Sequence, residues 1–320
     1  MMDWTDRHCR FFHRLMSRSV LLYTEMVTAP ALVRGGALHL LDFDPAEHPV
    51  AVQLGGSDPG ELAEATRIAA DRGYDEVNLN VGCPSDRVQS GCFGAVLMET
   101  PDLVRRIVAA MVAAAPVEIT VKCRIGVDDQ DAGTVLPDFL ARIRDAGVRR
   151  VAIHARKAWL QGLSPRENRE IPPLDYGLVH AMKARFPDLH ISVNGGVQSL
   201  AEARAFLEAG LDGVMIGRAA YHAPADILLP ADRVIFGDAG PDRTPHEIAR
   251  AMLPYIEAQM AAGHRLHAVT RHMLGLFAGR PGARAWRRHL SEHGPREGAG
   301  PEVVEAALAR VPEEADRASA

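Results

Sequence analysis

The chain has 320 residues, 47% of them hydrophobic, and a net charge of −5 at neutral pH. A chain of this length can bury a large core and form one large domain, or one domain with a smaller appendage. The negative net charge excludes a generally cationic nucleic-acid binder, so any basic surface has to be local.

The distribution of apolar residues and cysteines disfavours two further classes. No apolar run approaches the roughly 18 residues of a membrane-spanning helix, and no signal peptide precedes the charged residues near the start. The four cysteines show no CxxC spacing, which argues against a zinc site and against a disulfide scaffold. We therefore expect a cytoplasmic protein that contacts no membrane and holds no metal.

Strand-like and helical segments alternate over the first 240 residues. Apolar or alternating runs predict strands at residues 19–26, 49–55, 76–81, 118–124, 150–155, 190–194 and 213–217. Helices are predicted between them at residues 59–72, 102–114, 134–146, 176–186 and 200–209, with Asp58 capping the first. This alternation predicts an α/β fold with a parallel sheet and right-handed crossovers.

Seven strands are one fewer than a (β/α)₈ TIM barrel requires. The chain also enters a helical stretch at residues 6–16 soon after it begins. We expect a TIM barrel whose first strand is missing or truncated at the N-terminus, with an open doubly wound sheet as the alternative. The barrel is favoured because polar and glycine-rich signals follow almost every strand, as the carboxyl-terminal face of a barrel requires.

The C-terminal part is predicted to be helical throughout. After a linker at residues 241–244, helices are expected at residues 245–262, 266–278, 283–292 and 301–310. Residues 264–289 contain six Arg, four His and no acidic residue. Arg284, Arg287 and Arg288 lie at helical spacing around Trp286, which suits contact with phosphate groups. A solvated helix face is the alternative, and the absence of acidic residues disfavours it.

The segment EVNLNVGCP, residues 76–84, carries the clearest chemical signal. Apolar residues alternate with Asn78 and Asn80, which predicts a strand. A glycine and a proline then place Cys83 in a turn, where a thiol could donate a proton to a substrate above the sheet. A free cysteine is usually a small buried hydrophobe, but the turn argues against burial here. The other cysteines are expected to be packing residues: Cys9, Cys92 and Cys123.

Lys122 ends an otherwise apolar strand in a chain that has only three Lys beside 33 Arg. A lysine in this position usually extends to solvent. Its rarity and its neighbours favour a chemical role instead. The ammonium could stabilise negative charge on an electron-rich ring such as reduced flavin, or it could form a Schiff base, as in an aldolase.

Further polar groups follow other strands: Gln53, His154, Asn194-Gly195-Gly196 and Gly217-Arg218. Gln53 could hydrogen-bond a planar heterocycle with both its donor and its acceptor, although a satisfied loop amide is the plainer interpretation. Lone histidines are more often structural, but His154 at the end of a barrel strand is well placed for chemistry. Glycines after the last two barrel strands favour phosphate binding through exposed backbone N–H groups.

Together these segments resemble the tRNA-dihydrouridine synthase family, and specifically its bacterial A subfamily. The matching stretches span nearly the whole chain: MMDWTDRHCR, AVQLGG, EVNLNVGCPSDRVQSGCFGAVLM, TVKCRIGVDDQD, IHARKAWLQGLSPRENREIPPLDY, SVNGGVQSL, GVMIGRAAY and HMLGLFAGRPGARAWRR. The resemblance implies an FMN-binding TIM-barrel catalytic domain in residues 1–240 and a helical tRNA-binding domain in residues 241–320. It also implies NADPH-dependent reduction of the C5–C6 bond of D-loop uridines at positions 20 and 20a of tRNA. We expect a monomer.

The resemblance also assigns roles to individual residues. It implies that Cys83 donates the proton to C5 of the uracil. The implied flavin contacts are Met1, Met2, Gln53, Lys122, His154, Asn194, Gly195, Gly196, Gly217 and Arg218. The implied tRNA contacts are Asn80, Arg166, Arg169, Arg284 and Arg287. The family's first strand ends in a flavin-binding segment, of which this chain has only the two methionines at its start.

Three other functions fit part of the pattern. A flavin barrel acting on a small molecule, such as a dihydroorotate dehydrogenase-like enzyme, explains the strand-end motifs but not the basic helical appendage. A flavin-free aldolase with Lys122 as nucleophile predicts a colourless protein that borohydride inactivates in the presence of substrate. A tRNA-binding protein without catalysis would bind tRNA and leave its uridines unreduced.

Overall fold

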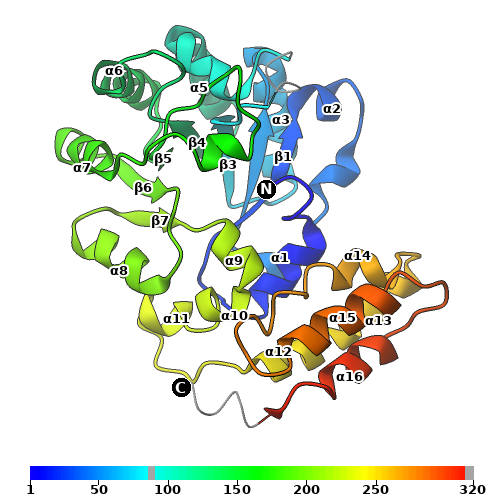
Figure 1. The fold of residues 1–320 in the computed structure, drawn as a ribbon. Coiled ribbons are helices and arrows are strands. Elements are labelled where there is room, and N and C mark those ends of the chain that lie inside the picture. The colour runs from blue at the N-terminus through cyan, green and yellow to red at the C-terminus, as the bar shows by residue number, and fades with distance from the viewer. Residues whose placement is uncertain (86–90, 314–320) are drawn as a thin grey trace.

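A curled, parallel, seven-stranded sheet forms the larger part of the molecule (Figure 1). The computed structural model describes residues 1–85 and 91–313. Within them the strands pair in chain order from the first to the seventh. They are β1 (Leu22–Thr28), β2 (Val50–Gly55), β3 (Glu76–Val81), β4 (Glu118–Arg124), β5 (Arg150–His154), β6 (His190–Asn194) and β7 (Gly213–Met215).

Helices cover the outer side of this sheet (Figure 1). They are α2 (Ala29–Val33), α3 (Pro59–Asp71), α5 (Pro101–Ala114), α6 (Ala132–Asp145), α7 (Tyr176–Arg185) and α8 (Leu200–Glu208). The described connections also contain short 3₁₀ helices: η1 (Leu38–Leu41), η2 (Pro45–Glu47), η3 (Gly94–Glu99) and η4 (Glu167–Arg169). As predicted, Asp58 caps α3, because its carboxylate accepts a hydrogen bond from the backbone N–H of Glu61.

All seven predicted strands are confirmed, and they form the predicted parallel sheet. In the described chain, β1 and β7 are the two edges and do not pair with each other. The closed eight-stranded barrel therefore stays a prediction. The first strand begins later than expected because Asp232 accepts hydrogen bonds from Ser17 and from the backbone N–H groups of Arg18 and Ser19.

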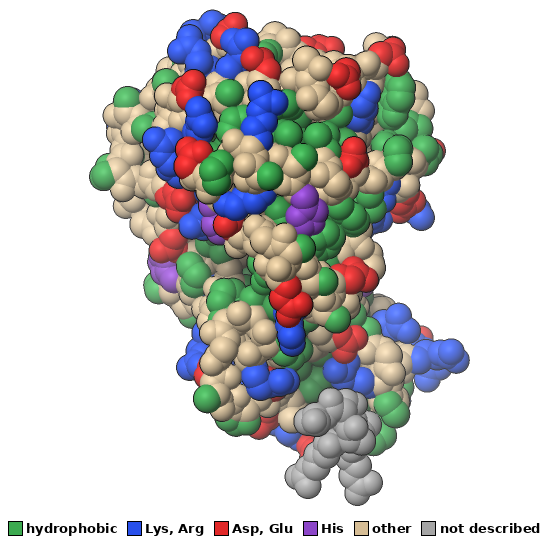
Figure 2. Space-filling model, turned by 90° about the vertical axis from the view of Figure 1, so that its left-hand side faces the viewer, with side chains coloured by type: hydrophobic (Ala, Val, Ile, Leu, Met, Phe, Trp, Pro, Cys, Tyr) green, Lys and Arg blue, Asp and Glu red, His purple; other side chains and the backbone are tan. Residues whose placement is uncertain are grey.

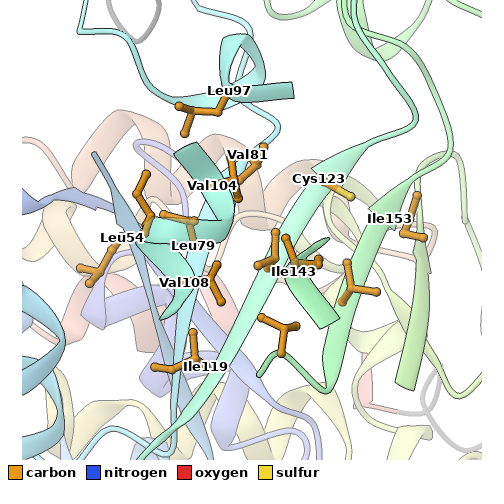
Figure 3. Close-up of a cluster of buried hydrophobic side chains, with 14 of the residues drawn as sticks. Leu54, Leu79, Val81, Leu97, Val104, Val108, Ile119, Cys123, Ile143 and Ile153 are labelled. Atoms are coloured by element: carbon orange, nitrogen blue, oxygen red, sulfur yellow. The ribbon is translucent and has the colours of Figure 1, made fainter. Parts of the chain in front are cut away.

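The outward-facing side chains of the strands form a dry core against the helices. Figure 3 shows Leu54, Leu79 and Val81 of β2 and β3 beside Val104 and Val108 of α5. All five side chains are fully buried. Burial of this apolar surface, at about 25 cal/mol per Å², is the main force that holds the strands in register.

Polar side chains occupy the concave side of the sheet. Asn78 and Asn80 alternate with the apolar residues of β3, so they face away from the helices. The register places Asn78 beside Gln53 of β2 and Thr120 of β4, and Asn80 beside Lys122. The strand-end residues predicted from the sequence are therefore brought together on one side of the sheet.

Helices α12 to α16 pack at one end of the molecule (Figure 1). The remaining helices of the described chain are α1 (Arg7–Arg14), α9 (Arg218–His222), α10 (Pro224–Ile227), α11 (Ala231–Val234), α12 (Pro245–Ala251), α13 (Leu253–Ala261), α14 (Leu266–Thr270), α15 (Ala283–His293) and α16 (Glu302–Leu308). The predicted helix at 245–262 is divided at Met252, where Pro254 opens α13. The helix predicted at 266–278 is shorter than expected and ends at Thr270. Gly275 follows it at a close contact, since a Cβ there would lie 2.5 Å from the carbonyl oxygen of His222.

These C-terminal helices share a second hydrophobic core with the N-terminal helix. Phe12 and Met16 from α1 and the following turn pack in the same cluster as Phe277 and Trp286. Trp286 is fully buried, and its indole N–H donates to the carbonyl of Met273 at 2.9 Å. A boundary between two domains at residue 240 therefore stays a prediction. No described helix is long and apolar enough to cross a membrane.

Candidate active site at the carboxyl ends of the strands

Cys83 lies in a turn directly after β3, as predicted. The side-chain oxygen of Asn80 accepts hydrogen bonds from the backbone N–H groups of Gly82 and Cys83, both at 3.0 Å. The carbonyl of Cys83 accepts from the N–H of Ala95 at 2.9 Å. The thiol is half-buried and lies 3.6 Å from the hydroxyl of Ser85. The turn thus keeps this cysteine partly accessible, while residues 86–90 of the same motif lie outside the described residues.

Lys122 lies beside Asn80 in the register of β3 and β4. Within the described residues, no group accepts a hydrogen bond from its ammonium and no carboxylate pairs with it. Burial, reinforced by the nearby Arg124, lowers the pKa of Lys122 to about 8. The amine therefore remains mostly protonated at neutral pH and offers a desolvated positive charge near the thiol.

Arg124, the last residue of β4, connects the thiol turn to the loop after β5. Its Nε donates to the carbonyl of Gly82 at 3.1 Å, and its Nη1 donates to the carbonyls of Lys157 and Asn168 at 3.0 and 2.9 Å. The side chain is buried, and burial lowers the pKa of Arg124 to about 10. It therefore stays charged at neutral pH. No role was predicted for this arginine from the sequence, because its three carbonyl partners come from separate segments of the chain.

His154 ends β5 and packs against the glycine pair that follows β6. Burial, together with nearby arginines and Lys122, keeps the pKa of His154 well below its ordinary value. The ring is therefore neutral at neutral pH. Gly195 has φ +108°, and a Cβ there would lie 2.5 Å from the imidazole. Gly196 has φ +78°, and its Cβ would lie 2.6 Å from the hydroxyl of Tyr176. Only glycine fits either position.

The ends of β6 and β7 expose backbone donors. The hydrogen bonds of the described residues include none donated by the N–H groups of Gly195, Gly196 or Gly217. Asn194 donates from its side chain to the carbonyl of Met215 at 2.8 Å and so ties the two strand ends together. Unpaired N–H groups beside glycines are the donors that phosphate groups take at this end of a barrel.

Arg218 and the first two residues border the same edge. The guanidinium of Arg218 pairs with Glu170 at 2.9 Å. The sulfur of Met1 lies 3.3 Å from the position that a Cβ on Gly217 would occupy. Met2 is more exposed, at 56%. The structure thus brings Met1 and Arg218 to the end of β7.

Gln53 and Asn80 are hydrogen-bonded to each other rather than free in loops. The Asn80 Nδ2 donates to Gln53 Oε1 at 2.7 Å, and Gln53 Nε2 donates to Asn78 Oδ1 at 2.9 Å. Asn80 is only 8% exposed. Each amide retains one hydrogen for a ligand above the sheet.

The loop after β5 carries Arg166 and Arg169, both exposed. Its conformation depends on Asn168, which is fully buried. The Asn168 side chain accepts from the N–H of Trp159 at 2.7 Å and donates to the carbonyls of Trp159 and Leu163 at 2.9 and 3.1 Å. No role was predicted for Asn168 from the sequence, because its partners become visible only in the folded loop.

The predicted basic surface of the C-terminal helices is present on α15. Trp286 anchors the helix in the core, so Arg284, Arg287 and Arg288 point outward and are exposed. None of these three pairs with a carboxylate among the described residues. Together with Arg280 they line a groove of about 520 Å³. By contrast, acidic and basic side chains are interspersed on the face shown in Figure 2.

One expectation for the cysteines is wrong. Cys9 and Cys123 are fully buried packing residues, as predicted, but Cys92 is exposed, with φ +56°. It lies two residues before η3, where the backbone turns sharply, rather than on an apolar face. The expectation failed because the apolar residues Phe93 and Ala95, which follow Cys92, make the local sequence look like a buried segment.

A half-buried thiol, a desolvated lysine and glycine-lined strand ends at one edge of a parallel sheet define an α/β enzyme with its active site at the carboxyl ends of the strands. A family model described as "Dihydrouridine synthase (Dus)" matches residues 1–312. The tRNA-dihydrouridine(20/20a) synthase of Vibrio vulnificus (strain CMCP6) is 55% identical over 317 residues, covering 99% of this chain and 96% of that relative. The enzyme of the same name from Escherichia coli (strain K12) is 55% identical over 312 residues, covering 97% of this chain and 90% of that relative. The chain belongs to the dihydrouridine synthase family, whose members form dihydrouridine in tRNA.

Proposed function

We propose that this protein is a tRNA-dihydrouridine(20/20a) synthase that reduces the C5–C6 bond of D-loop uridines with FMN as its flavin and NADPH as reductant. The observation that carries this proposal is the half-buried Cys83 thiol beside the desolvated Lys122, in a chain 55% identical to enzymes of that name. The sheet is then that of a (β/α)₈ barrel, and residues 241–320 form the tRNA-binding part. Because its proposed substrate is tRNA, we place the protein in the cytoplasm.

The donor set at the strand ends fits an FMN molecule. The N–H groups of Gly195, Gly196 and Gly217, with Arg218, suit its phosphate, because phosphate takes backbone donors and a guanidinium. The two glycines after β6 leave space that a Cβ would fill. The other proposed flavin contacts are Met1, Met2, Gln53, Lys122, His154 and Asn194. When bound, FMN supplies the hydride for C6 of the uracil after reduction by NADPH.

The chain's own residues then act on the substrate. Cys83 donates its thiol proton to C5, and the resulting thiolate regains a proton from water, so one hydride and one proton saturate the bond. Lys122 offers positive charge where electron density develops during the reaction. The His154 ring is neutral, so one of its nitrogens can donate a hydrogen bond to the flavin or the base and the other can accept one.

The substrate uridine has to leave its base stack to reach the site, as for other enzymes that act on bases. Arg166 and Arg169 lie on the loop beside the thiol turn, and Arg284 and Arg287 lie on the distant α15. These four cations hold the tRNA backbone by electrostatic contact, so binding weakens steeply with salt. Asn80 offers its second amide hydrogen to the base.

The test uses tRNA that lacks dihydrouridine, incubated with the purified protein, FMN and NADPH. Mass spectrometry of nuclease fragments locates any product. Dihydrouridine at positions 20 and 20a supports the proposal. Consumption of NADPH with a small-molecule acceptor and none with tRNA would instead support a flavin barrel of different substrate class. If the protein binds tRNA but leaves its uridines unreduced, it is a tRNA-binding protein without this catalytic activity.

A further inference from the structure

A continuous chain of hydrogen-bonded polar side chains, most of them buried, runs along the concave side of the sheet to the thiol turn. Two of its links join Asn80 to Gln53 and Gln53 to Asn78, as described above. From there, Asn78 Nδ2 donates to Thr120 Oγ1 at 2.7 Å, and the Thr120 hydroxyl donates to Glu76 Oε1 at 2.6 Å. Asn78, Thr120 and Glu76 are at most 2% exposed. The chain thus runs from the partly accessible Gln53 of β2 to three residues of β3 and β4 that are shielded from bulk water.

The donor direction of this chain is fixed at both ends. At the turn, the backbone N–H groups of Gly82 and Cys83 can only donate, so the Asn80 atom they reach is its oxygen. At the buried end, Glu76 Oε1 also accepts from the hydroxyl of Tyr23 at 2.5 Å. Burial raises the pKa of Tyr23, so this hydroxyl keeps its proton and donates.

Each amide between these ends therefore has one possible orientation. Reversing the side-chain amide of Gln53 would bring two donors or two acceptors together at both of its neighbours. Reversing Asn78 would bring two donors together at Gln53, and the Thr120 hydroxyl would have to donate to Asn78 instead of Glu76. A buried polar group without a partner is costly, so a change at one link is passed to the next. The far end of the chain is the Asn80 oxygen that holds the turn.

We infer that the three residues at the buried end of this chain, Glu76, Asn78 and Thr120, are positioning residues that orient the Cys83 turn through the two amides above them. The rate effect of this arrangement rests on the proposed function, but the effect on the thiol itself does not. The same chain decides which free hydrogen and lone pair of Gln53 face a ligand above the sheet.

Thr120→Val provides the sharpest test because it keeps the side-chain shape and removes only the hydroxyl that links Asn78 to Glu76. Thr120→Ser restores the hydroxyl. Thr66→Val is the matched control, since Thr66 is fully buried on α3 and its hydroxyl donates only to Leu62 of the same helix. Glu76→Gln keeps an oxygen that accepts from Thr120 and therefore preserves the donor direction.

Two quantities are measured for each variant in a Cys92→Ser background, which removes the exposed thiol. The first is the alkylation rate of Cys83 by iodoacetamide without substrate or cofactor. The second is dihydrouridine formation under saturating and limiting tRNA. Cys9 and Cys123 are fully buried and contribute little to alkylation.

Thr120→Val is expected to raise the Cys83 alkylation rate about three- to tenfold, in line with the loss of one buried hydrogen bond. It is expected to lower kcat by at least about tenfold with a smaller change in KM, because the acid is misplaced while Asn80 is the one proposed tRNA contact that belongs to the chain. Thr120→Ser and Glu76→Gln are expected to keep the alkylation rate and the rate of dihydrouridine formation close to those of the parent protein. Equal behaviour of Thr120→Val and Thr66→Val in alkylation would overturn the inference. A changed alkylation rate without any dihydrouridine in the parent protein would instead overturn the proposed function alone.

Discussion

Arg124 and Gly82 are joined by a hydrogen bond of 3.1 Å from the guanidinium Nε to the carbonyl oxygen. The same guanidinium donates to the carbonyls of Lys157 and Asn168. One buried side chain therefore holds the thiol turn after β3 and the arginine-bearing loop after β5 at a fixed separation. Since a carbonyl is its partner at each contact, its positive charge remains available to the site.

Arg124→Lys is expected to lose much of this arrangement, because an ammonium cannot reach three carbonyls in the planar geometry of a guanidinium. The free energy of unfolding should fall by about 2–4 kcal/mol, since each lost bond to a charged group contributes about 1.5–3 kcal/mol. Denaturant unfolding measures this change. Arg142→Lys is the control, because Arg142 pairs with Asp102 and Asp138 on the exposed side of α6; its cost should stay below about 1 kcal/mol. Equal costs for the two variants would contradict the bracing role.

Lys122 should titrate in an unusual pH range. Burial lowers its pKa from the ordinary 10.5 to about 8, so the charged form dominates below pH 8 and is lost above it. The acetylation rate of Lys122, followed by peptide mass spectrometry, should rise with a midpoint near pH 8, and FMN affinity should fall over the same interval. Lys122→Arg should remove this fall in affinity because arginine stays charged. A midpoint at the ordinary lysine value would refute the desolvation argument.

The arginines of α15 should contribute to tRNA affinity without affecting the flavin. Arg284→Ala with Arg287→Ala removes two unpaired cations from the groove, so the slope of log affinity against log salt should decrease by about 1–2. The control is Arg67→Ala with Arg204→Ala, since these two exposed arginines pair with Glu64 and Glu208 on helices α3 and α8. Filter binding at several salt concentrations measures the slopes. If the two double variants have the same slope, the phosphate-contact assignment is wrong.

Asn168 should control the tRNA-facing loop. Asn168→Ala removes three short hydrogen bonds to the loop backbone and is expected to disorder Arg166 and Arg169 together. KM for tRNA should rise by about tenfold or more, while FMN binding should change less, because most of the proposed FMN contacts lie on the strand ends and not on this loop. Steady-state kinetics and flavin fluorescence give the two values. Loss of flavin affinity with an unchanged KM for tRNA would show that Asn168 supports the flavin site and not the tRNA-binding loop.

The alternation of apolar and amide residues in β3 was enough to predict both the strand and the position of Cys83 after it. Local patterns also located the other strands and the cap at Asp58, because those features depend on residues close in sequence. The positioning chain could not be predicted in this way. Thr120 lies 42 residues from Asn78, and only the sheet register places their side chains 2.7 Å apart.

The same limit explains the errors. The start of β1 depends on Asp232, which is more than 200 residues away in sequence. The split of the helix at 245–262 was visible in principle, since Pro254 favours the first turn of a helix. The helix expected at 266–278 ends at Thr270, and the chain after it approaches His222 closely at Gly275, a contact that no local pattern reports.

The central claim is that Cys83 is the acid that completes the reduction of uridine. The variant Cys83→Ala separates the reduction of the flavin by NADPH from the reduction of uridine by the flavin. The variant should bind FMN and oxidise NADPH at the normal rate, because neither step needs the thiol. In a single turnover with prereduced enzyme and excess tRNA, dihydrouridine formation at positions 20 and 20a should fall by at least about a hundredfold, the usual contribution of a general acid. Formation at the wild-type rate would contradict the account.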